Sequence, residues 1–131
     1  MTIANWCVVA AYLLPIATIG IAKASRSKLP RKEGGYDNHA PRAWAAKLQG
    51  WQGRAVAAHD NGFEALPLFI AAVILAQQAH VAQSTIDGLA LGFIGIRVAY
   101  IALYLLDYPL FRSVVWFLGV VACIALFVIT G

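Results

Sequence analysis

The stretch from Ile3 to Ala22, IANWCVVAAYLLPIATIGIA, carries no charged side chain. A helix rises about 1.5 Å per residue, so about twenty apolar residues cross the hydrocarbon core of a bilayer. The stretch is therefore predicted to be a membrane-spanning helix. No positive charge precedes the apolar run and Lys23 follows it directly, which is unlike the charge order of a secretory signal peptide. We expect the helix to be a retained anchor whose first residue lies outside the cell.

Three more apolar runs follow, at about residues 54–79, 88–106 and 110–130. Hydrophobic residues make up 61 % of the 131 residues and charged residues 12 %, against about 45–50 % and about 25 % in soluble domains. The mean hydropathy is +0.72. The sequence therefore predicts an all-α fold, in which residues 1–131 form a single four-helix transmembrane domain with spans at about 3–22, 54–79, 88–106 and 110–130.

Positive charge is concentrated in one connecting segment. Of the ten Lys and Arg residues, eight lie from Lys23 to Arg54, in or directly after the loop 23–53. Loops rich in Lys and Arg stay on the cytoplasmic side of a membrane. We therefore expect this loop to be the inner one and both chain termini to lie outside. A basic loop at a membrane end also accounts for the net charge of +4, so we expect no nucleic-acid binding.

Small residues within the spans are typical of helix packing. Gly88 and Gly92 form a small-xxx-small pair, which Gly95 extends, and such a pair predicts a close approach of two membrane helices. Cys7 and Cys123 both lie inside apolar runs. We expect these cysteines to be small packing residues, which say nothing about the redox compartment.

Ionisable residues within the spans point to a polar interior. Each costs about 3 kcal/mol to insert, so such groups tend to face a partner or a cavity. Glu64 lies ten residues after Arg54, and Arg97 lies ten residues before Asp107, so in antiparallel helices both fall at the same depth of roughly 15 Å. We predict an Arg97–Glu64 ion pair, supported by Asn61. A purely structural role for this pair stays open.

Other chemistry is poorly supported by the sequence. The three histidines, His39, His59 and His80, are widely separated, and no Cys–His spacing suits zinc. No nucleophile triad, Walker loop or dinucleotide fingerprint is present. We expect no metal. Near the inner ends of their spans, Tyr104 and Arg112 can reach one polar pocket, where an arginine stabilises a thiolate or another anion and a hydroxyl donates to developing negative charge.

Two segments resemble the motifs of a known family. The segment Arg54–Phe69, RAVAAHDNGFEALPLF, resembles the second-helix motif of the MAPEG family, the membrane-associated proteins in eicosanoid and glutathione metabolism. The stretch Arg97–Tyr104, RVAYIALY, followed by Arg112-Ser113, resembles the family's second motif. The resemblance covers essentially the whole chain. The short loops resemble those of bacterial members, which implies the bacterial inner membrane.

The resemblance implies a homotrimer that binds glutathione at each subunit interface, near the cytoplasmic side. Glutathione enters as the thiol substrate. In this reading Arg112 stabilises the glutathione thiolate, with Ser113 beside it as the second catalytic residue. The remaining residues of the motifs are implied to hold the tripeptide: Arg54, Asn61, Glu64, Arg97, Tyr100 and Tyr104. The resemblance also implies, less strongly, that Lys23 at the end of the first span contacts the ligand bound to a neighbouring subunit.

The function implied is that of a membrane-bound glutathione transferase or peroxidase, which acts on lipophilic electrophiles that reach it through the surrounding lipid. Two residues depart from the family pattern. Asp60 stands where a prostaglandin-type member has an arginine, and Trp116 stands where several eukaryotic members have an aromatic hydroxyl. These departures favour the alternative of a non-catalytic scaffold, accessory subunit or binder of lipid-like molecules. Another small thiol in place of glutathione also stays open.

Overall fold

The computed structural model describes all 131 residues as an all-helical chain. Its elements are α1 (Ile3–Arg26), the short 3-10 helix η1 (Arg31–Glu33), α2 (Pro41–Ala46), α3 (Gly50–Gln78), α4 (Gln83–Leu105) and α5 (Pro109–Val128). Four of these helices, α1, α3, α4 and α5, are long and apolar enough to cross a membrane. The prediction of an all-α bundle of four membrane-spanning helices is therefore confirmed.

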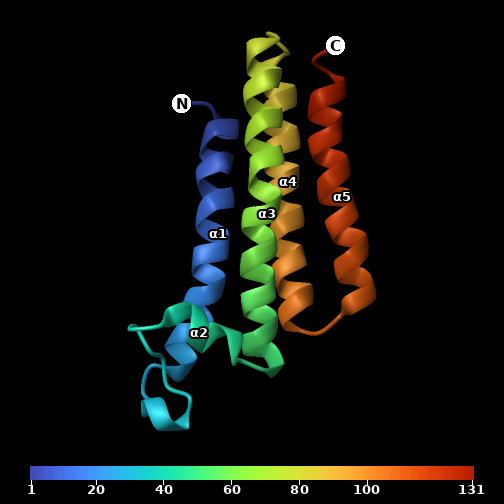
Figure 1. Cartoon of the computed structure of the whole chain (residues 1–131). Coiled ribbons are helices and arrows are strands. Elements are labelled where there is room, and N and C mark those ends of the chain that lie inside the picture. The colour runs from blue at the N-terminus through green and yellow to red at the C-terminus, as the bar shows by residue number, and fades with distance from the viewer.

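The four long helices run antiparallel, so that both chain termini lie at one end of the bundle (Figure 1). The loop with η1 and α2 lies at the other end, together with the turn that joins α4 to α5. This loop is ordered by its aromatic residues: the Trp44 indole N–H donates to the Gly34 carbonyl at 3.2 Å, and the Tyr36 ring packs edge-on against Trp44. The basic residues of the loop are thereby held at one end of the bundle.

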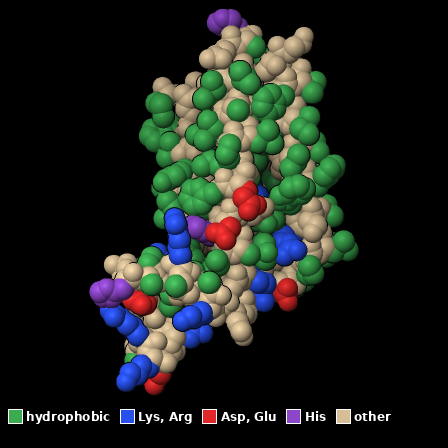
Figure 2. Space-filling view, viewed as in Figure 1, with side chains coloured by type: hydrophobic (Ala, Val, Ile, Leu, Met, Phe, Trp, Pro, Cys, Tyr) green, Lys and Arg blue, Asp and Glu red, His purple; other side chains and the backbone are tan.

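The outer surface of the bundle is apolar. Only 22 of the 131 residues are buried, and large side chains such as Phe111, Phe117, Ile124 and Val128 of α5 are exposed. Figure 2 shows hydrophobic side chains over most of the bundle, with Lys and Arg gathered toward the end that carries α2. A surface of this kind suits lipid chains around the helices and lipid headgroups around the loop. The protein is an integral membrane protein.

The helices are joined by a core of small and aromatic side chains. Phe69 of α3 and Phe93 of α4 stack with their ring centroids 4.1 Å apart. Cys7 and Cys123 are both buried in this core as free thiols, as expected of packing residues. At the end that carries the termini, the Asp87 carboxylate accepts a hydrogen bond of 2.9 Å from the backbone N–H of Ala4. This bond ties the first turn of α1 to α4 and fixes the depth of α1.

Two helices approach closely at a glycine that the sequence pattern did not single out. A Cβ at Gly62 of α3 would lie 2.4 Å from Cγ of Pro15 in α1, so only glycine fits. At Gly88, Gly92 and Gly95 an added Cβ would have nothing within 4 Å. The prediction of a close approach at these three glycines is therefore wrong within the chain, because each of them faces open space rather than a neighbouring helix.

This contact gives a stability prediction. We expect Gly62→Ala to destabilise the protein by about 1–3 kcal/mol, because the added methyl overlaps Pro15 and α1 must shift. The matched control is Gly88→Ala, which has open space and should be neutral or slightly stabilising, since alanine favours a helix. Thermal unfolding in detergent, followed by circular dichroism, measures both. Equal melting temperatures for the two variants would contradict the prediction.

Candidate functional site

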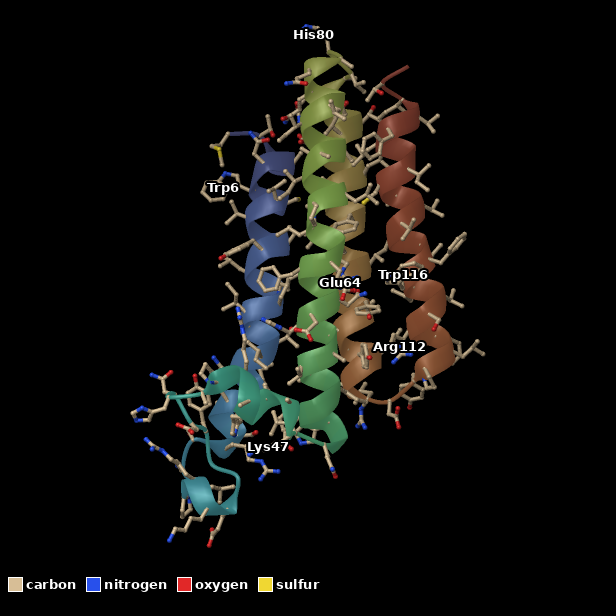
Figure 3. The ribbon with its side chains drawn as sticks, in the orientation of Figure 1. Trp6, Lys47, Glu64, His80, Arg112 and Trp116 are labelled. Carbon is tan, nitrogen blue, oxygen red and sulfur yellow. The ribbon has the colours of Figure 1, made fainter.

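Two adjoining cavities lie between α3 and α5, with α4 behind them. The inner cavity, nearer the α4–α5 turn, has a volume of about 230 Å³ and is lined by Asn61, Tyr100, Tyr104, Arg112, Ser113 and Trp116. The deep cavity has a volume of about 160 Å³ and is lined by Asn61, Glu64, Ala65, Leu68, Phe93, Arg97, Trp116, Gly119, Val120 and Cys123. They share Asn61 and Trp116. We call the space between α3 and α5 that contains both cavities the groove. Figure 3 shows Glu64 on α3 facing this groove across from Trp116 on α5, with Arg112 nearer the α4–α5 turn.

Helical periodicity explains why these residues converge. Side chains three or four positions apart lie on one face of a helix. On α4, Arg97, Tyr100 and Tyr104 follow this spacing, and on α5, Arg112 and Trp116 do the same. Each helix therefore turns one polar face toward the groove, while its remaining faces stay apolar.

The inner cavity contains an arginine held by aromatic rings. The Arg112 guanidinium lies 4.2 Å from the centroid of the Tyr104 ring, and Tyr104 packs edge-on against Tyr100 at 5.6 Å. Tyr100 in turn lies under the Arg97 guanidinium at 4.3 Å. No carboxylate pairs with Arg112. The cavity therefore offers an unneutralised, oriented cation, a group that stabilises an anion such as a thiolate.

The N-terminal end of α5 adds to the positive potential of Arg112 in the inner cavity. Pro109 occupies its first turn, and the Ser113 hydroxyl donates to the Pro109 carbonyl at 3.0 Å. The hydroxyl proton of Ser113 is thus committed to the backbone, while its oxygen remains free to accept a hydrogen bond. Arg112 and Ser113 both lie in the first turns of α5, where the helix dipole favours negative charge.

Arg97 and Glu64 do not pair directly. Arg97 is 6 % exposed, and its Nη1 donates to Asn61 Oδ1 at 3.0 Å. Asn61 Nδ2 then donates to Glu64 Oε2 at 3.4 Å. The predicted Arg97–Glu64 ion pair is therefore wrong, because Glu64 is exposed at the mouth of the groove while Arg97 is buried behind it. Asn61 bridges the two groups.

Arg54 lines neither cavity. Its Nη2 donates to the Leu105 carbonyl at 3.2 Å, and its Nη1 lies 4.0 Å from the Asp107 carboxylate. Arg54 thus stabilises the C-terminal end of α4, where exposed carbonyls favour a cation. Lys23 is also elsewhere, 4.9 Å from the Tyr36 ring. Seven predicted site residues do line the two cavities: Asn61, Glu64, Arg97, Tyr100, Tyr104, Arg112 and Ser113.

The apolar lining of the deep cavity was not predicted from the sequence. Leucine, valine and phenylalanine are abundant in any membrane helix, so Leu68, Phe93 and Val120 carried no distinguishing signal. The sequence did offer a clue to Trp116, because Trp116 lies one turn after Arg112 on α5 and therefore shares a face of that helix with it. His59 Nδ1 lies 2.9 Å from Oδ1 of the Asp60 carboxylate. No group of three His, Cys, Asp or Glu side chains is placed to hold a metal ion.

The sequence model described as the MAPEG family matches residues 3–131. The match runs from the start of α1 to the end of the chain and includes both cavities. No curated protein and no solved structure was found to match the chain.

Proposed function

This chain belongs to the MAPEG family, and we propose that it is a membrane-bound glutathione transferase that acts on lipophilic electrophiles. The family includes glutathione transferases and peroxidases as well as non-catalytic members. The observation that carries the proposal is the position of Arg112: a cation without a carboxylate partner, beside a cavity lined by hydroxyl groups. This is the environment that keeps a thiol ionised at neutral pH.

In the proposed reaction, the inner cavity holds the cysteinyl sulfur of glutathione as a thiolate beside Arg112. Asn61 and Glu64 bind the tripeptide backbone, and the hydroxyls of Tyr100 and Tyr104 are available to donate to it. The thiolate attacks an electrophilic carbon, a C–S bond forms, and the leaving group departs with its bonding electrons. With a hydroperoxide, two glutathiones are oxidised to the disulfide while the O–O bond is reduced to an alcohol and water. Positioning and thiolate stabilisation supply the rate.

The proposal includes a homotrimer with the site on the cytoplasmic side of the cell membrane. Glu64 is exposed at the mouth of the groove in the single chain, and the Asp60 side chain is 62 % exposed, although both lie within a helix able to span the membrane. Carboxylates facing lipid are costly. A neighbouring copy that covers α3 with its own polar groups removes that cost and completes the site at the subunit interface.

The test is spectroscopic. Glutathione added to the purified protein in detergent at neutral pH should give the ultraviolet difference band of a thiolate, because Arg112 stabilises the ionised sulfur. S-methylglutathione, which has no thiol, is the control and should give no band. A missing band with glutathione would refute the proposed function, and a band with a different small thiol instead would correct the identity of the donor.

Trp116 favours a second candidate, a non-catalytic binder of lipid-like molecules. It stands between the two cavities and presents only an indole N–H, which cannot act as an acid in the way a hydroxyl can. If the protein binds glutathione without ionising it, and turns over no acceptor, this candidate replaces the transferase.

A further inference from the structure

A further cavity lies in the basic loop between α1 and α3, apart from the groove. It has a volume of about 370 Å³, within the range of about 300–1,000 Å³ that is typical of ligand pockets. None of its lining residues lines the two cavities of the groove. Its charged lining residues are Arg26, Arg31, Asp37 and Lys47. We call this space the loop cavity.

The walls of the loop cavity are held in place by contacts of the backbone. Gly34, Gly35 and Trp44 all line it. An added Cβ at Gly35 would overlap the Leu29 carbonyl, so only glycine fits there. Trp44 is buried, and its indole N–H donates to the Gly34 carbonyl at 3.2 Å. The loop is thus folded back on itself, and the cavity is formed before any ligand binds.

The positive charge of the loop cavity is not balanced by the chain. Three cations and the Asp37 carboxylate give its lining a net charge of +2. Asp37 Oδ1 lies 3.7 Å from Arg31 Nε, and no carboxylate lies within 4.0 Å of Arg26 or Lys47. Arg26 Nη2 donates instead to the neutral Gln52 side chain at 3.3 Å. Such a lining attracts an anion, and arginine and lysine are the side chains that commonly bind phosphate.

The loop cavity lies where the membrane surface meets the chain. Arg26 is the last residue of α1, a helix long and apolar enough to span the membrane, so the cavity begins at the level of the lipid headgroups. Leu29 and Trp51 are exposed close by, 40 % and 36 %, and tryptophan favours that level. Figure 3 shows Lys47 at the end of the bundle that carries α2, well apart from Arg112. Basic pockets at the ends of membrane helices are suited to lipid headgroups.

From this charge, shape and position we propose that the loop cavity binds the phosphate group of an anionic phospholipid such as phosphatidylglycerol. Its three cations bind the phosphate oxygens, while the acyl chains stay in the bilayer. A zwitterionic headgroup fits less well, because it brings its own cation to a lining that already carries excess positive charge. The bound lipid neutralises the cavity and ties the loop to the membrane surface. This inference does not depend on glutathione chemistry.

The experiment compares two lysines of the same loop. Lys47→Glu brings the net charge of the loop cavity from +2 to zero. Lys32→Glu is the matched control, because Lys32 is also exposed, lines no cavity and changes the charge of the whole protein equally. Native mass spectrometry of the protein in detergent, titrated with dioctanoylphosphatidylglycerol, gives a Kd for each. We expect Lys47→Glu to raise this Kd at least about fivefold, the effect of one cation near a headgroup. Lys32→Glu should match the wild type.

The wild type alone identifies the class of ligand. Dioctanoylphosphatidylglycerol should bind more tightly than dioctanoylphosphatidylcholine, whose headgroup carries no net charge. Glycerophosphoglycerol, the same headgroup without acyl chains, should bind more weakly than the lipid, because it loses the apolar contacts of the chains. These comparisons need no variant, so they stand even if Lys47→Glu fails to fold.

Three results would each contradict part of the proposal. Equal Kd values for phosphatidylglycerol in the wild type and both variants would overturn the loop cavity as the site. Equal binding of phosphatidylglycerol and phosphatidylcholine would overturn selection by negative charge. Glycerophosphoglycerol that binds as tightly as the lipid would overturn the lipid as ligand, and would assign the cavity to a soluble phosphate compound.

Discussion

Arg112→Ala is expected to lower kcat for conjugation of glutathione with a lipophilic electrophile by about 10²–10³-fold. That is the usual loss when one preorganised group facing a reacting anion is removed. Arg112 is fixed over the Tyr104 ring and has no carboxylate partner, so its charge is available to the sulfur. The thiolate band should disappear with the activity. Helix content and oligomeric state should not change, because Arg112 makes no ion pair that holds the bundle.

The control for this prediction is Arg42→Ala, which removes the same charge from an exposed position at the start of α2. It lowers the net charge equally and should leave kcat unchanged. Arg112→Lys should recover part of the activity, since it restores the charge without the planar guanidinium that stacks on tyrosine. Unchanged turnover in Arg112→Ala would remove Arg112 from the mechanism.

The length and position of the spans were accessible from sequence because they follow from the composition of long apolar runs. The depth of the charged residues within the spans was accessible too: counting 1.5 Å per residue from each helix end placed Glu64 and Arg97 at one level. Resemblance to family motifs brought in Arg112 and Ser113, and the structure places both beside one cavity. The inferences about the spans and about the depth of Glu64 and Arg97 need only distances along a helix axis.

Rotation about the helix axis and the reach of side chains could not be obtained in this way. Arg54 shares a broad face of α3 with Glu64, yet its long side chain bends to the end of α4 and bonds Leu105. The spacing of the glycines on α4 predicts a packing contact, but the close contact is between Gly62 and Pro15. Both outcomes depend on how neighbouring helices are turned toward one another, which a single apolar sequence leaves open.

Asn61 bridges Arg97 and Glu64 by hydrogen bonds, and its replacement is expected to have the second large effect, on stability. Asn61→Ala is expected to destabilise the protein by about 3 kcal/mol, because it removes the hydrogen-bond acceptor of a buried guanidinium and a buried charged group without a partner is costly. Thermal unfolding in detergent measures the loss. Glutathione binding should weaken as well, since Asn61 lines both cavities.

A double variant identifies the cause. Arg97→Met removes the buried charge and keeps an unbranched apolar side chain, so the double variant Asn61→Ala/Arg97→Met should recover at least about half of the stability lost by Asn61→Ala alone. The recovery arises because no unpaired cation remains in the bundle. If the two changes instead add, Asn61 stabilises the protein by packing, and Arg97 does not depend on it. Where stability does recover, activity should not follow it, because Asn61, which lines both cavities, is still missing from the double variant.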